Sequence, residues 1–89
     1  MLQIYYFTAK WCGPCRAFGP IVDQVKSEFP NVNITKLDVD SHQDMVSKYE
    51  INSVPKLVFE KGGRVVDVRT GAMSKSALES IIRSFTLAS

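Results

Sequence analysis

The chain has 89 residues, of which 45% are hydrophobic and 22% are charged, and these proportions are typical of one globular domain and not of a disordered chain. Its formal net charge of +2 comes from dispersed basic residues, so the sequence does not favour nucleic acid as a partner. No apolar run approaches the roughly 18 residues of a membrane span, and the N-terminus lacks the segments of an export signal. We therefore expect a single cytoplasmic domain over residues 1–89 that does not bind membranes.

The first part of the chain predicts a strand, a turn and a helix. Leu2 to Thr8 is short, rich in β-branched and aromatic residues and apolar on both faces, which predicts a buried central strand. After a Cys-Gly-Pro-Cys turn, apolar residues recur at spacings of three and four, which predicts a helix from about Pro14 to Phe29. Pro20 lies within this helix and is expected to kink it, because proline removes a backbone hydrogen bond.

A second strand and a short helix follow. Residues 33–39 alternate between apolar and polar side chains, which predicts a strand. Residues 42–49 predict a short helix, with Ser41 as its N-terminal cap.

The rest of the chain predicts a hairpin and a last helix. Lys56–Glu60 and Arg64–Thr70 read as two strands joined by a tight turn at residues 61–63. Ser74 is a candidate cap for a final helix with an apolar stripe. The order β-α-β-α-β-β-α predicts an α/β fold with a mixed four-stranded sheet, because the first crossover joins parallel strands and the hairpin joins antiparallel ones. Helices are expected on both faces of this sheet.

The two cysteines stand where the first strand ends and the first helix begins. A ring closed across two intervening residues gains too little chain entropy to act as a structural staple, so its value lies in cycling between dithiol and disulfide. Cys12 falls near the start of the helix, where unpaired N–H groups and the helix dipole favour a thiolate. Cys15 lies one turn further along the buried stripe and is expected to stay protonated until it is needed.

This arrangement predicts a two-step exchange reaction. The Cys12 thiolate attacks a substrate disulfide, and Cys15 then attacks Cys12 and releases the reduced substrate. A structural zinc site needs about four ligands, and His42 is the only other good candidate, so we expect no metal. A covalent haem would require histidine where Arg16 stands. Redox chemistry is therefore favoured over zinc binding, inert burial and a degenerate copy of a redox motif.

The segment Trp11-Cys12-Gly13-Pro14-Cys15 is identical to the active-site segment of thioredoxins, and the resemblance continues over nearly the whole chain. Residues 36–40 resemble the second shared strand of that family, residues 51–55 its cis-proline loop and residues 59–63 its hairpin. On these motifs the chain is identified as a member of the thioredoxin family, and the resemblance implies a thioredoxin-like fold with strand order 2-1-3-4. Because only ten residues precede Trp11, we expect an N-terminally trimmed version that is closer in size to glutaredoxins.

The resemblance also implies roles for residues outside the motif. Pro55 should be cis and should face Cys12, which would leave the Val54 backbone free to pair with an extended substrate segment. The implied apolar groove is formed by Trp11, Gly13, Pro14, Val54, Pro55, Gly71 and Ala72. The implied activity is reduction of protein disulfides by a monomer that needs no bound cofactor. Its reducing equivalents would come from NADPH through thioredoxin reductase or a similar donor.

One departure from the family pattern concerns proton transfer. Tyr6 stands where the family has a buried acid that is thought to move the proton of the second cysteine, and Lys36 matches the basic neighbour of that acid. A phenol is neutral at pH 7 and cannot serve as the same base. One alternative is slower or differently pH-dependent resolution by Cys15, with water or Lys36 assisting. The other is that Tyr6 only fills core volume and Lys36 simply reaches solvent.

Two further functions stay open at this point. The chain could be a glutaredoxin-like protein or a dedicated electron donor, for example to ribonucleotide reductase. It could also be a redox-independent binding subunit of a larger enzyme, a role that a groove around Trp11 and Pro55 would suit.

Overall fold

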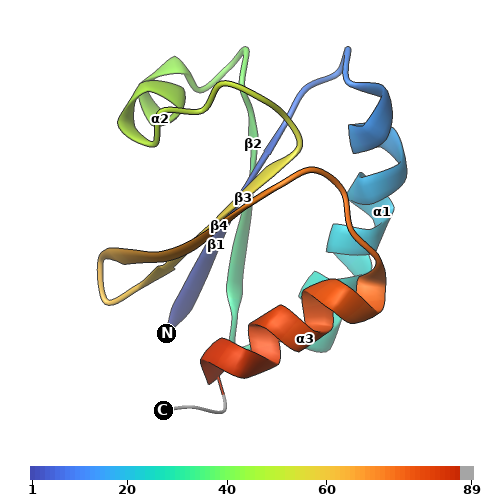
Figure 1. Cartoon of the computed structure of the whole chain (residues 1–89), viewed down its shortest axis with the longest axis vertical. Helices are drawn as coiled ribbons and strands as arrows, with labels where there is room; N and C mark the ends of the chain where they lie inside the picture. The colour runs from blue at the N-terminus through green and yellow to red at the C-terminus, as the bar shows by residue number, and fades with distance from the viewer. Residues whose placement is uncertain (87–89) are drawn as a thin grey trace.

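A computed structural model describes residues 1–86 as a four-stranded mixed sheet with helices on both faces (Figure 1). The strands are β1 (Leu2–Thr8), β2 (Asn33–Asp38), β3 (Lys56–Lys61) and β4 (Arg64–Thr70), and the helices are α1 (Gly13–Glu28), α2 (Gln43–Lys48) and α3 (Lys75–Thr86). The sheet order is β2-β1-β3-β4. β1 is parallel to β2 and antiparallel to β3, and β4 is antiparallel to β3. The predicted fold class, element order and strand order are thus confirmed.

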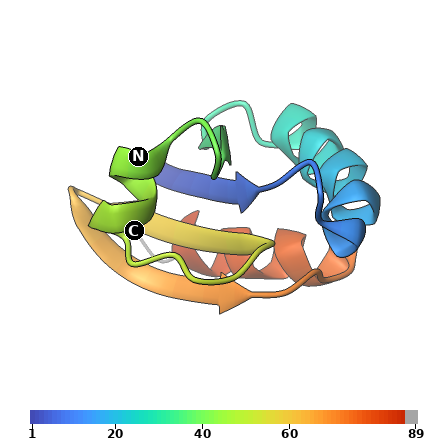
Figure 2. The same ribbon diagram turned by 90° about the horizontal axis from the view of Figure 1, so that it is seen from above.

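The sheet separates a large core from a small one. Helices α1 and α3 cover one face, where Tyr6 of β1 and Phe59 of β3 are fully buried (Figures 1 and 2). Helix α2 covers part of the other face, over Phe7 and Val58. Because β1 lies between two strands and both of its faces are covered, it is the buried central strand that its sequence predicts. Its carboxyl end leads directly into α1, and this junction carries both cysteines.

The hairpin between β3 and β4 matches its predicted position. Gly62 and Gly63 form the two-residue turn with φ values of 60° and 77°. Positive φ at both central residues is what the favoured two-residue hairpin turn requires, and glycine adopts it without steric cost. A bulge between Phe59 and Glu60, which the sequence did not reveal, shifts the register of the two strands.

The predicted helices are present, but one cap was assigned to the wrong residue. Ser74 caps α3, since its Oγ accepts a hydrogen bond from the Ala77 N–H at 3.2 Å. Ser41 does not cap α2, because the cap position is occupied by His42 and Ser41 lies in the preceding turn, with its N–H donated to the Asp38 carbonyl. Pro20 lies inside α1 as predicted. None of the helices within residues 1–86 is long and apolar enough to cross a membrane.

Tyr49, at the end of α2, anchors that helix to the sheet. Its ring lies 5.3 Å from the ring of Tyr5, and its hydroxyl donates a hydrogen bond to the Glu60 carboxylate. Burial, reinforced by that hydrogen bond, raises the pKa of Tyr49 well above its ordinary value. The raised pKa makes this contact a pH-dependent contribution to folding.

We expect the protein to lose stability above about pH 10, where tyrosine ionises in the unfolded chain. Tyr49 keeps its proton there in the folded state, so the folded protein binds more protons than the unfolded chain does. The free energy of unfolding therefore falls as the pH rises, by up to about 1.4 kcal/mol per pH unit. Urea unfolding at neutral pH and above pH 10 measures this slope, and Tyr49→Phe should flatten it. An equally steep slope in Tyr49→Phe would show that another group is responsible.

Candidate active site

The β1–α1 junction places Cys12 at the N-terminal cap of α1. The Cys12 N–H donates to the Ala9 carbonyl at 3.2 Å, which closes the turn after β1. Cys12 has an extended backbone conformation, and its Sγ accepts a hydrogen bond from the Cys15 N–H at 3.2 Å. No acidic residue lies in the first turn, so no negative side chain there opposes the positive end of the helix. The Cys12 sulfur therefore occupies a position at which a helix stabilises an anion.

The two cysteines form a disulfide and are almost completely covered. Cys12 is 5% exposed and Cys15 is 4% exposed. They pack with Ala9, and with the half-buried side chains of Val39 and Val54. Cys15 lies on the buried stripe of α1, as its spacing predicts. The disulfide is therefore held in an apolar setting at the edge of the molecule.

A loop before β3 brings Pro55 to the disulfide. The Val54–Pro55 peptide bond is cis, and the Val54 carbonyl oxygen lies 3.8 Å from Cys12 Sγ. The Gly71 N–H donates to the Pro55 carbonyl at 2.9 Å, so the segment after β4 lies beside this loop. Within residues 1–86 the Val54 N–H has no hydrogen-bond partner. The loop thus presents an unpaired backbone N–H next to the cysteine pair.

Trp11 stands at the surface beside this loop. Its side chain is 67% exposed, and its Nε1–H donates to the Asp40 carboxylate at 3.1 Å, which orients the ring. The sequence did not predict a role for Asp40, although this residue ends the segment 36–40 that resembles the second shared strand of the family. A cavity of about 230 Å³ lies next to Trp11 and is lined by Trp11, Val39, Asp40, Gln43, Val46, Ile51, Asn52, Ser53 and Val54. Gly13, Pro14 and Ala72 are exposed, whereas Gly71 is half-buried.

Tyr6 lies close to Cys15 but does not point at its sulfur. The Tyr6 hydroxyl lies 3.4 Å from both the Cys15 carbonyl oxygen and Thr8 Oγ1, so it donates weakly to either. Its ring packs edge-to-face on Phe18 at 5.6 Å. Tyr6 is fully buried, and it fills the space between the sheet and the first turns of α1.

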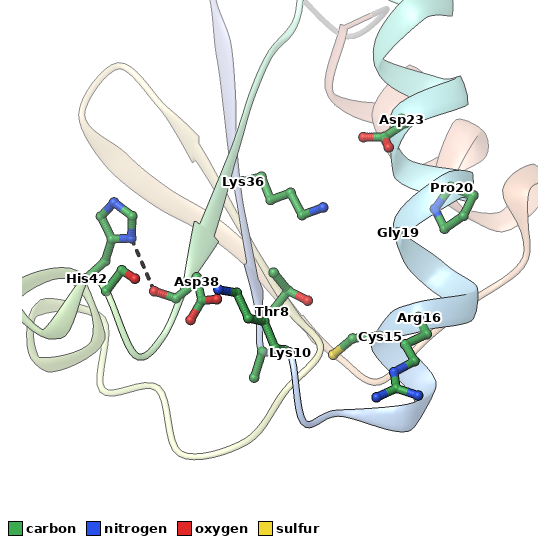
Figure 3. Close-up of a pocket in the computed structure, with 12 residues that line it drawn as sticks. Thr8, Lys10, Cys15, Arg16, Gly19, Pro20, Asp23, Lys36, Asp38 and His42 are labelled. Carbon is green, nitrogen blue, oxygen red and sulfur yellow. Dashed lines mark hydrogen bonds between the residues drawn. The ribbon is translucent and has the colours of Figure 1, made fainter.

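Lys36 lies opposite Tyr6 in the parallel pairing of β1 and β2. Its ammonium has no hydrogen-bond or ion-pair partner within residues 1–86. It points instead into a second cavity, of about 610 Å³, which Cys15 also lines (Figure 3). The structure therefore brings Lys36 and Cys15 to one cavity, and Lys36 makes no hydrogen bond with Tyr6.

The described part of the chain holds no group of three or more His, Cys, Asp and Glu side chains that could bind a metal ion. The reactive group that the structure describes at the β1–α1 junction is the Cys12–Cys15 disulfide.

Comparisons with known proteins agree with this geometry. The family model described as thioredoxin matches residues 2–84. A thioredoxin from Synechocystis is 39% identical over 80 residues, which are 89% of this chain and 75% of that protein. One from Mycoplasmoides gallisepticum is 36% identical over 77 residues, 86% of this chain and 77% of that protein.

Solved structures give the same result. The thioredoxin of Fasciola hepatica superposes with a TM-score of 0.84 at 39% identity, covering 92% of this chain and 79% of that one. A mutant thioredoxin from Halobacterium salinarum has a TM-score of 0.86 at 34% identity, covering 96% of this chain and 74% of that one. With its cysteine pair joined at the start of α1, the chain belongs to the thioredoxin family and is a thiol–disulfide oxidoreductase.

Proposed function

We propose that the protein reduces protein disulfides, with Cys12 as the attacking thiolate and Cys15 as the resolving thiol. These roles are supported mainly by one hydrogen bond: the Cys15 N–H donates to Cys12 Sγ at the first turn of α1. In the reduced protein the same N–H can stabilise a thiolate at Cys12, because hydrogen bonds to an ionised acceptor are stronger. No group in the described part of the chain donates a comparable hydrogen bond to Cys15 Sγ, and Cys15 lies one turn further along α1 on its buried stripe.

The substrate is an extended segment that lies across Trp11 and the Val54–Pro55 loop. The unpaired Val54 N–H, half-buried beside Cys12, supports this assignment, because an added strand is held mainly by backbone hydrogen bonds. The exposed Trp11 ring and the neighbouring Gly13, Pro14, Gly71 and Ala72 give the groove its apolar surface. Val54 would pair with the substrate residue next to the disulfide.

The reducing equivalents come from NADPH through thioredoxin reductase or a similar donor, and the protein itself holds no cofactor. We further propose that residues 1–89 form one domain that acts as a monomer in the cytoplasm. Reduction of insulin disulfides with NADPH and thioredoxin reductase, compared with glutathione as donor, tests this proposal. Activity with the reductase is expected. Activity with glutathione alone would favour the glutaredoxin-like alternative, and activity with neither donor would favour a binding role.

Tyr6 positions the backbone of Cys15 and fills core volume, and it does not move protons. Tyr6→Phe is therefore expected to leave the pH profile of turnover unchanged and to lower the free energy of unfolding by about 0.5–1.5 kcal/mol, the usual net value of a hydrogen bond. Tyr6→Asp should cost several kcal/mol, because it removes a buried ring and buries a carboxyl group. Turnover against pH, with urea unfolding, measures both effects. A shifted pH profile in Tyr6→Phe would instead assign the hydroxyl to proton transfer.

A further inference from the structure

The cavity beside Cys15 is distinct from the substrate groove. It is bordered by α1, the end of β1, the end of β2 and the turn before α2, and it shares no lining residue with the cavity next to Trp11 (Figure 3). Its volume of about 610 Å³ is enough for many water molecules, each of which occupies about 30 Å³ in the liquid. The sulfur of Cys15 points into it. A substrate that covers Trp11 and Val54 would leave this cavity open to water.

Strand register places a carboxylate on the same side of the sheet as Cys15. Tyr6 pairs with Lys36 and Thr8 pairs with Asp38, and paired residues project from the same face. Tyr6 faces the core under α1, so Lys36 and Asp38 project from β2 towards α1 as well. Both side chains line the cavity, where Lys36 is exposed and Asp38 is half-buried. Asp38 Oδ1 accepts the Asp40 N–H at 2.9 Å, which fixes the carboxylate at the end of the strand.

We propose that the proton of the Cys15 thiol leaves through this cavity and that Asp38 accepts it by way of water, so that Asp38 is a positioning residue for the resolving step. The proposal rests on the roles of Cys12 and Cys15 given above. The S–H proton passes to water and then to the Asp38 carboxylate, and the Cys15 thiolate attacks Cys12 Sγ. The Cys12–Cys15 bond forms while the Cys12–substrate bond breaks, the two cysteines are oxidised, and the substrate sulfur leaves as a thiolate.

The other groups that face Cys15 are less suited to this role. The cations Lys10, Arg16 and Lys36 line the same cavity, but a charged ammonium or guanidinium group has no lone pair with which to accept a proton. His42 lies at the far end, with its Nδ1 3.1 Å from the Asp38 carbonyl oxygen. Tyr6 directs its hydroxyl at the backbone.

Asp23 is the other carboxylate of the cavity, and it serves as the matched control. It is eight residues beyond Cys15 on α1, a rise of about 12 Å along the helix. It is exposed, whereas Asp38 is half-buried. Asp23→Asn removes the same charge from the same cavity at the end away from the sulfur.

The test follows both steps of the reaction with an aromatic disulfide whose released thiolate is coloured. Attack by Cys12 on this reagent releases one equivalent, and intramolecular resolution by Cys15 releases the second at a rate independent of reagent concentration. We expect Asp38→Asn to slow the second phase about tenfold at pH 7 and to match the wild type above about pH 9, where hydroxide replaces the base. Asparagine keeps the oxygen that accepts the Asp40 N–H, so the fold should be retained. The first phase should be unchanged.

Three results of this experiment would overturn the role of Asp38. An unchanged second phase in Asp38→Asn, or equal slowing in Asp23→Asn, would overturn the role of Asp38. A faster second phase would overturn it too, since it would identify the carboxylate as a charge that opposes thiolate formation. The proposed roles of the cysteines are tested separately: Cys15→Ser should release only the first equivalent, and failure to release even that would refute the attack by Cys12.

Discussion

Cys12→Ser is expected to abolish disulfide reduction, with a loss of at least about a thousandfold in the rate of insulin reduction. A serine hydroxyl is not ionised near neutral pH and is a far weaker nucleophile for a disulfide sulfur than a thiolate. Serine is also a favoured residue at a helix N-terminal cap, so α1 should form as before. The loss would therefore report on chemistry and not on folding, and circular dichroism of the variant checks this.

Cys15→Ser provides the matched comparison, because it removes the other sulfur of the same pair. The attack by Cys12 should survive in this variant, and the mixed disulfide with a substrate peptide should accumulate, since no thiol is left to resolve it. Mass spectrometry of the trapped adduct identifies it. If Cys12→Ser trapped substrate and Cys15→Ser did not, the two roles would be reversed. The Cys12→Ser, Cys15→Ser double variant would keep only a redox-independent binding function.

Phe59→Ala is expected to lower the free energy of unfolding by about 3–5 kcal/mol, the usual loss for a buried phenylalanine. Phe59 is fully buried at the centre of β3, and its ring lies 5.8 Å from that of Phe85 on α3. A small domain has only about 5–15 kcal/mol of total stability, so this single change should remove a large share of it. Urea unfolding at 25 °C, read as a shift of the midpoint with an unchanged slope, measures the loss.

Phe85→Ala is the control for this prediction. Phe85 contacts the same ring but is only partly buried, so its truncation should cost distinctly less. Because Pro55 directly precedes β3, unfolding of this strand also displaces the loop that lies beside Cys12, and activity of Phe59→Ala should fall at temperatures that the wild type tolerates. Equal losses of unfolding free energy in the two variants would show that the cost of truncation does not depend on how deeply each ring is buried.

The sequence was sufficient to predict the framework because its signals there are local. Each of three elements is indicated by residues within it or next to it. These signals are the apolar spacing along α1, the Gly62-Gly63 pair in the turn between β3 and β4, and the Ser74 cap of α3. The WCGPC segment located the cysteine pair for the same reason. Element ends were off by a residue or two, as at β2, which ends at Asp38, where Val39 only continues the ladder by donating its N–H to the Thr8 carbonyl.

What sequence reasoning missed depends on contacts between distant segments. The bulge at Phe59 arises from how β3 and β4 pair, and the bond from Trp11 to Asp40 joins residues 29 positions apart. The cavity beside Cys15 is lined by residues from the end of β1, from α1, from β2 and from the turn before α2, which only the fold brings together. The prediction that Ser41 caps α2 was wrong because Ser41 lies in a turn, where its N–H donates to the Asp38 carbonyl. The helix starts after His42, one residue later than predicted.

In the reduced protein, Cys12 at the cap of α1 is expected to be a stabilised thiolate, because the Cys15 N–H donates to its sulfur, whereas Cys15 is expected to remain a thiol. Alkylation of the reduced protein with iodoacetamide at pH 7, with the modified residue located by mass spectrometry, tests this directly. A free cysteine is only a few per cent ionised at that pH, so Cys12 is expected to react about tenfold faster than free cysteine, with Cys15 far slower. Labelling of neither residue faster than free cysteine would show that α1 does not stabilise a thiolate at Cys12.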